Sequence, residues 1–332
     1  MLNYTDRSFL ITGGTGSFGH AFVRYLLDYT EARRVIIYSR DEYKQFLMQQ
    51  EFSKYLHRLR FFIGDVRDEQ RLHRAMNGVD YVVHAAAMKQ VPACEYNPME
   101  AVNTNVVGAM NVINASLDNS SISRVIALST DKAVSPINLY GGTKLVSDKL
   151  FTAANSYAGR RTVRFSLVRY GNVAGSRGSV IPFFKQKIED GVKSLPLTDE
   201  RMTRFWMTLD KSVSLVMKAL ELSMGGETFV YKNPSFYVTD LIEAMSPKGK
   251  YTVTGIREGE KVHECMITSS DSLRTYEYDD HYVIYPNYDW WTVETGIIPG
   301  GKKVESEWEY TSDKNNWWLS MEDLQRLLPE IH

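Results

Sequence analysis

Cysteine is almost absent from this chain, since only Cys94 and Cys265 occur among its 332 residues. The two lie far apart in the sequence, and neither belongs to a closely spaced group of metal ligands. The sequence therefore predicts neither a disulfide framework nor a metal site, and the pattern fits a reducing compartment.

Long apolar runs and an excess of charge of one sign are also lacking. No stretch has the length and apolarity needed to cross a bilayer, and the start, "MLNYTDRSFLITGG", lacks the basic and apolar regions of a signal peptide. Lys and Arg number 39 against 40 Asp and Glu, so no overall field favours nucleic acid or an anionic membrane. We expect a cytoplasmic protein that holds any anionic ligand with local charges.

Short apolar segments recur along the first half of the chain, separated by stretches long enough for a helix. Their hydrophobicity is continuous rather than alternating, which is typical of parallel strands covered on both faces. We predict an α/β fold with a Rossmann-type, doubly wound parallel sheet. The predicted strands are residues 8–12, 34–39, 60–65, 81–87 and 124–130.

The second half of the chain is less regular, and its loops are rich in Gly, Pro and charge. We predict a dinucleotide-binding Rossmann domain over residues 1–170 and a smaller substrate-binding lobe over residues 171–332. No linker separates the two, so we expect the lobe to be interleaved with the last elements of the sheet. Near the end, "NNWWLSMEDLQRLL" predicts a short helix capped by Ser320.

A glycine-rich turn, "TGGTGSFG", follows the first predicted strand and precedes a helix. Gly13, Gly16 and Gly19 let the backbone turn tightly and approach a pyrophosphate at the helix N-terminus. Because the turn lies in the strand and helix context that dinucleotide binding requires, we interpret it as a cofactor site rather than a plain turn.

Cofactor choice is predicted from the end of the second strand. Arg40 and the Ser39 hydroxyl favour the 2′-phosphate of NADP, because a guanidinium donates several charged hydrogen bonds to phosphate. An acidic residue there would favour NAD, and Asp41 comes one residue later. We therefore predict NADP, while NAD stays possible.

The spacing of the three glycines resembles that of the short-chain dehydrogenase/reductase superfamily. This resemblance implies that Asp65 and Val66 contact the adenine, and that the small side chains of Ala85 and Ala86 let the fourth strand pass under the cofactor. Other residues of the glycine turn are also implied as cofactor contacts, namely Thr15, Ser17 and Phe18.

Tyr140 and Lys144 are four residues apart, so in a helix they share one face. A free tyrosine has a pKa of about 10, and an ammonium beside it favours the phenolate. Tyr140 can then take a proton from a sugar hydroxyl while the carbon loses hydride, and Thr130 orients the substrate oxygen. We also expect Tyr140 and Lys144 to contact the cofactor.

Asp131 and Lys132 exceed what a plain dehydrogenase or epimerase requires. The segment "STDKA", with "PINLYGGTK", "HAAAMKQVP", "VRYGNVAGSRGSVIPFF", "MTRFW" and "GIREGEKVHE", resembles the UDP-N-acetylglucosamine 4,6-dehydratases that invert C5 at the first step of pseudaminic acid synthesis. Retaining dehydratases have glutamate where Lys132 stands. The resemblance covers almost the whole chain.

The resemblance implies a reaction that uses these residue types. Oxidation at C4 acidifies the hydrogen on C5, and loss of the C6 hydroxyl as water then needs an acid and a base. Asp131, if protonated, can donate to the leaving oxygen, and Lys132, if neutral, can take the C5 proton. The resemblance also implies contacts to UDP-N-acetylglucosamine from Lys89, Thr130, Asn172, Arg204, Arg257 and Glu260, with Lys89 near the cofactor as well.

Several alternatives remain open. On the same scaffold the chain could be a retaining dehydratase, a 5-epimerase or a bifunctional dehydratase-epimerase of capsule or O-antigen synthesis. Lys132 speaks against retention, and some bifunctional enzymes carry methionine where Tyr140 stands. From another class, the chain could be an NADP-binding redox sensor without turnover, and one incubation with the UDP-sugar would separate these. The resemblance also implies a homo-oligomer, a hexamer.

Overall fold

The computed structural model describes residues 4–176, 178–246, 250–288, 291 and 296–330. Within these residues one large sheet has the strand order β15-β13-β14-β9-β6-β5-β4-β1-β2-β3. From β3 to β9 neighbouring strands pair in parallel. These strands are β1 (Ser8–Thr12), β2 (Arg34–Ser39), β3 (Leu59–Ile63), β4 (Tyr81–His84), β5 (Arg124–Thr130), β6 (Arg164–Tyr170) and β9 (Thr228–Tyr231).

The predicted strands are confirmed, and two of them end earlier than predicted. Two apolar segments continue past their strands as loop, because β3 ends at Ile63 and β4 ends at His84. The loop after β4 stays attached to the sheet, since the Ala85 N–H donates to the Thr12 carbonyl at 3.2 Å and the Ala86 N–H to the Thr12 hydroxyl at 3.3 Å. The apolar loops therefore lie beside the carboxyl ends of the strands.

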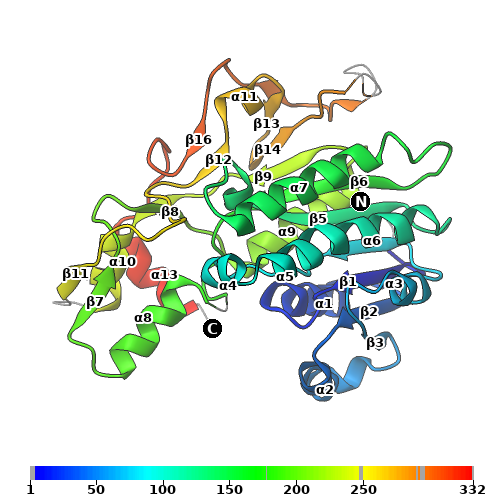
Figure 1. The fold of residues 1–332 in the computed structure, drawn as a ribbon, viewed down its shortest axis with the longest axis horizontal. Helices are drawn as coiled ribbons and strands as arrows, with labels where there is room; N and C mark the ends of the chain where they lie inside the picture. Colours follow the sequence, from blue (N-terminus) through cyan, green and yellow to red (C-terminus); the bar gives the residue numbers. More distant parts are fainter. Residues whose placement is uncertain (1–3, 177, 247–249, 289–290, 292–295, 331–332) are drawn as a thin grey trace.

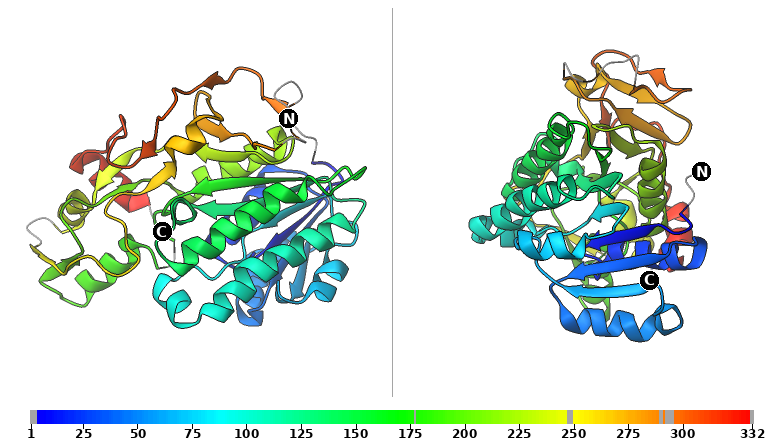
Figure 2. Two further views of the ribbon diagram at one scale, coloured as in Figure 1. Left: turned by 45° about the horizontal axis from the view of Figure 1, so that its top comes forward. Right: turned by 90° about the vertical axis from the view of Figure 1, so that its right-hand side faces the viewer.

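Helices cover both faces of the sheet, as continuous apolar strands require (Figure 1, Figure 2). On one face a buried core joins β-strand side chains to α1 (Ser17–Tyr29), α2 (Glu42–Glu51) and α9 (Leu209–Leu222). On the other face a second core joins them to α3 (Glu69–Ala75), α6 (Gly108–Leu117) and α7 (Leu139–Ala154). A chain of shorter helices leads into α6, namely α4 (Val91–Tyr96), α5 (Pro98–Val102) and a π-helical turn (Asn103–Val107). The predicted doubly wound α/β fold is confirmed.

The sheet is extended by strands from late in the chain. β14 (His281–Ile284) pairs antiparallel with β9, and β13 (Thr275–Glu277) and β15 (Lys302–Lys303) follow it. The sheet therefore crosses the division that we predicted at residue 170, as expected for an interleaved lobe. The boundaries of the two domains stay a prediction.

A smaller lobe lies beside the carboxyl ends of the parallel strands, on the left in Figure 1. It has its own buried core, built around Trp206, Phe236 and Leu241. Its elements are α8 (Val180–Glu189), β7 (Ser194–Leu197), β8 (Thr203–Phe205), β10 (Ser235–Tyr237), α10 (Val238–Met245), β11 (Lys250–Val253) and α13 (Met321–Leu327). Short elements connect it to the sheet, namely β12 (Cys265–Ile267), α11 (Ser269–Ser272) and β16 (Tyr310–Thr311).

The predicted terminal helix is α13, and Ser320 caps it. The Ser320 side chain accepts from the Asp323 N–H at 3.2 Å, and the Asp323 carboxylate accepts from the Ser320 N–H at 3.1 Å. This reciprocal pair is a capping box, which satisfies two donors that a helix start leaves open.

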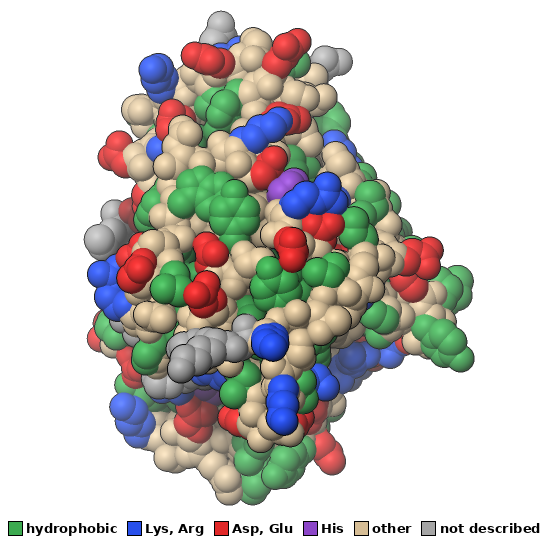
Figure 3. Space-filling view, turned by 90° about the vertical axis from the view of Figure 1, so that its left-hand side faces the viewer, with side chains coloured by type: hydrophobic (Ala, Val, Ile, Leu, Met, Phe, Trp, Pro, Cys, Tyr) green, Lys and Arg blue, Asp and Glu red, His purple; other side chains and the backbone are tan. Residues whose placement is uncertain are grey.

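Among the described residues, no helix combines the length and apolarity that a membrane span needs. The same residues contain no group of three or more metal-binding side chains. On the face that includes the smaller lobe, acidic and basic side chains are interspersed (Figure 3).

Candidate active site

A cavity of about 1120 Å³ lies between the carboxyl ends of the parallel strands and the smaller lobe. It lies where the strand order reverses between β1 and β4, which is where open α/β sheets bind ligands. Its volume slightly exceeds the roughly 300–1,000 Å³ of ordinary single-ligand pockets. The cavity is therefore large enough for a cofactor and a substrate together.

The cavity lining collects almost all of the side chains predicted to form the site. It includes each residue predicted to contact the cofactor or the substrate, and four of the predicted catalytic residues, Thr130, Lys132, Tyr140 and Lys144. Asp131 is not part of this surface, because its side chain lies fully buried behind Lys132.

The glycine turn is shaped as a cradle for a phosphate group. Gly13 has a φ of +66°, and a Cβ there would come within 2.9 Å of the Ala86 backbone. A Cβ on Gly19 would come within 2.5 Å of the Gly14 Cα. Gly16 is the N-cap of α1 and offers no side-chain cap, and the first residues of the helix line the cavity, as pyrophosphate binding at a helix N-terminus requires. A dinucleotide fits this cradle.

The end of β2 supplies a cation and hydroxyls to the same cavity. The Ser39 hydroxyl lies 2.7 Å from that of Thr15, and the Arg40 guanidinium, 59% exposed, lies 3.7 Å from the Asp65 carboxylate. Asp41 is used differently, because its carboxylate caps α2 by accepting from the Lys44 N–H at 3.0 Å. Arg40 is thus the side chain best placed to meet a further anion.

Tyr140 lies in the first turn of α7 and is almost fully buried at the cavity wall. Asn138 caps this helix, accepting from the Gly141 N–H at 2.8 Å. Gly141 permits a close approach, because a Cβ there would lie 2.1 Å from the Lys132 carbonyl oxygen. The tyrosine is therefore held next to the loop that follows β5.

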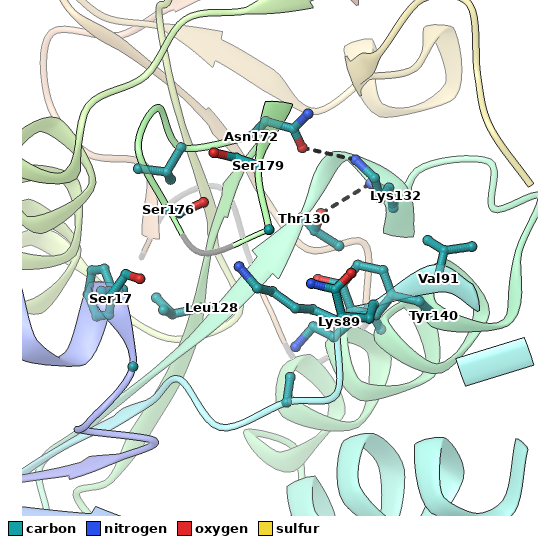
Figure 4. Close-up of a pocket in the computed structure, with 18 of the residues that line it drawn as sticks. Ser17, Lys89, Val91, Leu128, Thr130, Lys132, Tyr140, Asn172, Ser176 and Ser179 are labelled. Atoms are coloured by element: carbon teal, nitrogen blue, oxygen red, sulfur yellow. Dashed lines mark hydrogen bonds between the residues drawn. The ribbon is translucent and has the colours of Figure 1, made fainter. Parts of the chain in front are cut away.

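At the end of β5 and in the loop that follows, the reactive side chains are hydrogen-bonded to one another. The Thr130 hydroxyl donates to the Asp131 carboxylate at 2.7 Å, and the Lys132 ammonium donates to both Asp131 oxygens at 3.2 and 3.3 Å. Lys132 also donates to the Asn172 amide oxygen at 3.2 Å, on the side of the pocket away from Ser17 (Figure 4). Asn172, which the resemblance implied as a substrate contact, is therefore a partner of Lys132.

Glu264 is a further member of this group that the sequence analysis missed. Its Oε1 lies 3.4 Å from the Lys132 ammonium and 3.4 Å from Nε of Arg204. Its side chain lines the cavity although only 5% of it is exposed. The sequence offered one signal, since Glu264 is the last residue of the segment "GIREGEKVHE".

Burial and charge set the protonation of these groups. Burial and the neighbouring Glu264 raise the pKa of Asp131, which is the direction that a proton donor needs. Burial would raise the pKa of Glu264 too, but Lys132 and Arg204 outweigh it and lower that pKa to about 2. The two carboxyl groups are therefore shifted in opposite directions, which makes Asp131 the one that takes up a proton more readily.

The condition set for Lys132 as a base was that the amine be neutral. Burial lowers its pKa, but Asp131 and Glu264 outweigh burial and raise the pKa above its ordinary value. The two carboxyl groups thus favour the ammonium form of Lys132, and its role as the base stays a prediction.

The Tyr140–Lys144 pair is buried as a unit. Burial raises the pKa of Tyr140 to about 12, while Lys132 and Thr130 act in the opposite direction. Lys132 is thus a cation beside Tyr140 that favours the phenolate, and the same role for Lys144 stays a prediction. Burial lowers the pKa of Lys144 below its ordinary value, although Asp148, one helical turn further on, acts in the opposite direction. Asp148 is a second buried residue that the sequence analysis missed.

The side chains predicted to bind the diphosphate differ in their freedom. Arg204 is buried, and its guanidinium donates to the carbonyls of Thr203, Val262 and Lys261 at 2.8, 2.9 and 3.0 Å. Arg257 is exposed at the cavity edge. Of the two arginines, Arg257 is the freer to bind an anion.

Two further predicted contacts flank these arginines. Glu260 accepts from the Thr198 hydroxyl at 3.1 Å. Burial and the nearby Lys132 lower the pKa of Lys89. The roles of these residues toward a substrate stay predictions.

Comparison with known proteins gives relatives over the whole chain. The family described as "Polysaccharide biosynthesis protein" matches residues 9–286. A UDP-N-acetylglucosamine 4,6-dehydratase (inverting) of Campylobacter jejuni is 49% identical over 330 residues, which cover 98% of this chain and 98% of the relative. A UDP-glucose 4-epimerase of Rickettsia canadensis is 41% identical over 332 residues, covering 98% of this chain and 96% of the relative.

Solved structures share the fold. Pen from Bacillus thuringiensis is 37% identical, with a TM-score of 0.89, over 99% of this chain and 100% of that one. DesIV, a dTDP-glucose 4,6-dehydratase from Streptomyces venezuelae solved with NAD and TYD, is 25% identical, with a TM-score of 0.66, over 77% of this chain and 86% of that one. The chain belongs to the polysaccharide biosynthesis protein family, within the extended short-chain dehydrogenase/reductase fold.

Proposed function

We propose that this chain is an inverting UDP-N-acetylglucosamine 4,6-dehydratase that uses NADP. One structural observation carries the proposal: Tyr140, Lys144 and Lys132 line one cavity, and Asp131 lies buried directly behind Lys132, 3.2 Å from its ammonium. Oxidation at C4 needs the first pair, and elimination of water across C5 and C6 needs a second acid and base. The full-length similarity to the inverting dehydratase of Campylobacter jejuni supports the same reaction.

The cofactor site supports a dinucleotide on physical grounds. Backbone N–H groups of the glycine turn would hold the pyrophosphate, and Arg40 with Ser39 would hold the 2′-phosphate of NADP. NADP supplies a hydride acceptor for C4 and a hydride donor for C6, and it is regenerated in each turnover. Asp41 is committed to capping α2, which favours NADP over NAD.

The chain's own residues would move the protons. Tyr140 takes the proton from the C4 hydroxyl, and Thr130 orients that oxygen. Asp131 and Lys132 serve the elimination, with Asp131 as the store of the proton that leaves with the C6 oxygen and Lys132 as the base at C5. Because Asp131 and Glu264 raise the pKa of Lys132, its ammonium would first pass a proton to the Asp131 carboxylate 3.2 Å away, which leaves Lys132 as the base and Asp131 as the acid.

The product would be the L-arabino 4-keto-6-deoxy sugar, still attached to UDP. This reaction would be the first step of pseudaminic acid synthesis, for flagellin or another surface glycan. Arg257, with Arg204 and Glu260, would hold the uridine diphosphate. The cytoplasmic location and the hexamer stay predictions.

The test is an incubation of the purified protein with UDP-N-acetylglucosamine in heavy water, followed by NMR. We expect deuterium at C5, transfer of the C4 hydrogen to C6, and the L-arabino configuration. Lys132→Ala should bind the UDP-sugar but form no product. A D-xylo product, with C5 retained, would refute inversion and leave Lys132 a structural cation.

An epimerase is the second candidate, because relatives named as epimerases are also similar over the full length. The same NMR experiment decides between the two. An epimerase would return a sugar that keeps its C6 hydroxyl, with inversion at C4. A redox sensor would leave the sugar unchanged.

A further inference from the structure

Glu264 enters the site from a different part of the chain than the other reactive groups. Its backbone is fixed on both sides by Ser312, since the Glu264 N–H donates to the Ser312 hydroxyl at 2.9 Å and the Ser312 N–H donates to the Glu264 carbonyl at 2.8 Å. Ser312 in turn lies 2.7 Å from the Thr203 hydroxyl. Segments that connect the smaller lobe to the sheet thus hold this carboxylate against the loop after β5.

The Glu264 carboxylate is only partly used by its neighbours. One oxygen, Oε1, meets Lys132 and Arg204. The other, Oε2, is buried without a hydrogen-bond partner among the described residues. A buried carboxylate oxygen without a partner is costly, so a role in stability alone does not account for its position.

The contacts of Lys132 narrow what Glu264 can do. Among the described residues Lys132 donates to three partners, which are Asp131, Asn172 and Glu264. Asn172 carries no charge, whereas Asp131 and Glu264 both raise the pKa of Lys132. Burial and Glu264 raise the pKa of Asp131, whereas Lys132 and Arg204 outweigh burial and lower that of Glu264, so Glu264 is the carboxyl whose negative charge this cluster favours.

We propose that Glu264 is the positioning residue that fixes both the place and the charge of Lys132 during turnover. The inference rests on the proposed function, because it concerns the lysine that serves the elimination. Glu264 itself transfers no proton in this scheme. It stabilises the ammonium, so it sets the pH at which Lys132 changes between acid and base forms.

A specific shift follows from the sign of this interaction. An opposite charge at 3.4 Å favours the charged form of Lys132. Replacing the carboxylate by the isosteric amide in Glu264→Gln removes that charge while keeping the shape of the side chain. The limb of the pH profile of kcat that belongs to Lys132 should therefore move to lower pH by about one unit or more.

Turnover of UDP-N-acetylglucosamine is measured for wild type and Glu264→Gln from pH 7 to pH 11.5. We expect a KM within about threefold of wild type, a lower maximal kcat because Lys132 loses a partner that places it, and the shifted limb. The control is Glu260→Gln, which removes the same charge from the same cavity but from a side chain that bonds Thr198 instead of Lys132. This control should not move the limb, whatever it does to KM.

A second arm needs no substrate and separates this inference from the proposed function. Protein with 13C-labelled lysine is titrated by NMR, and the Lys132 signal is identified by its loss in Lys132→Arg. The Lys132 signal should titrate at lower pH in Glu264→Gln than in wild type. If wild type forms no product while this shift is seen, the proposed function fails and the role of Glu264 stands.

Other outcomes overturn the inference. A kcat that falls equally at all pH values, with an unmoved lysine titration, would make Glu264 a structural clamp. A variant indistinguishable from wild type would remove it from the site altogether. Should Glu264→Gln not fold, Glu264→Asp is used instead, because it keeps the charge one methylene further from Lys132. The limb of its kcat profile should lie at slightly lower pH than that of wild type. A limb at or above the wild-type pH overturns the inference.

Discussion

Arg40 offers the most direct test of how the cofactor is chosen. It follows β2 and lines the cavity, and its one ion pair among the described residues is a long 3.7 Å contact with Asp65. Asp65 has a closer partner, because the Arg67 guanidinium donates to it at 2.6 Å. Turning Arg40 toward a 2′-phosphate therefore breaks only a weak ion pair and leaves Asp65 with its Arg67 partner. Arg40→Ala should remove the preference for NADP.

The size of the effect follows from exposure. A hydrogen bond to a charged group contributes about 1.5–3 kcal/mol, but the Arg40 side chain is 59% exposed, so solvent and salt bring the value to the low end. About 1.5 kcal/mol corresponds to roughly tenfold in Kd. Arg40→Ala should thus weaken NADP about tenfold and leave NAD within about twofold.

The assay is isothermal titration of both cofactors into wild type and variant at two salt concentrations. The matched control is Arg67→Ala, which also removes a partner of Asp65 but lies outside the cavity lining. The NADP preference of wild type should shrink at high salt, and Arg67→Ala should keep it. Equal affinity of wild type for NAD and NADP, or equal losses in the two variants, would refute the role of Arg40.

Three further changes test other parts of the site. Tyr140→Phe should keep cofactor and UDP-sugar binding yet lose nearly all turnover, measured as kcat, because the phenolic oxygen is needed for proton removal; near-normal kcat would move the base elsewhere. Gly19→Ala should abolish cofactor binding by titration, because its Cβ would lie 2.5 Å from the Gly14 Cα. Burial, reinforced by Lys144, lowers the pKa of His84 from 6.5 to about 3. Below pH 6.5 the unfolded chain therefore binds more protons than the folded chain, and the free energy of unfolding falls as the pH drops. His84→Gln should reduce the shift of the urea midpoint between pH 7 and pH 5; an unchanged shift would contradict the linkage.

The fold could be predicted in detail because its strands are buried on both faces. Continuous apolar segments gave three strands at their observed bounds, Ser8–Thr12, Arg34–Ser39 and Arg124–Thr130. Parallel strands end at one edge of a sheet, so residues far apart in sequence could be expected to line one cavity. The residues predicted to contact the cofactor and the substrate all line the cavity, so their positions agree with that expectation. Their roles stay predictions.

The chemistry of the catalytic cluster could not be predicted in the same way. The sequence shows Asp131 and Lys132 as neighbours. It does not show that Glu264, which lies 132 residues after Lys132 in the chain, contacts the same lysine. Neighbouring carboxyl groups raise the pKa of a lysine, whereas burial alone lowers it. The direction of the Lys132 shift therefore depends on a tertiary contact that no local pattern encodes.

The charge of the whole cluster connects substrate binding to this chemistry. Lys132 and Arg204 both meet the Glu264 carboxylate, at 3.4 Å each, and both side chains line the cavity. These two cations face a cavity proposed to hold a diphosphate, and they favour binding of the anion. A bound diphosphate in turn favours the ammonium form of Lys132. Substrate binding alone therefore does not favour the free amine, so Lys132 must pass its proton to a neighbouring group before it can take the C5 proton. The Asp131 carboxylate, 3.2 Å from the ammonium, is placed to accept it and to deliver it later to the leaving C6 oxygen.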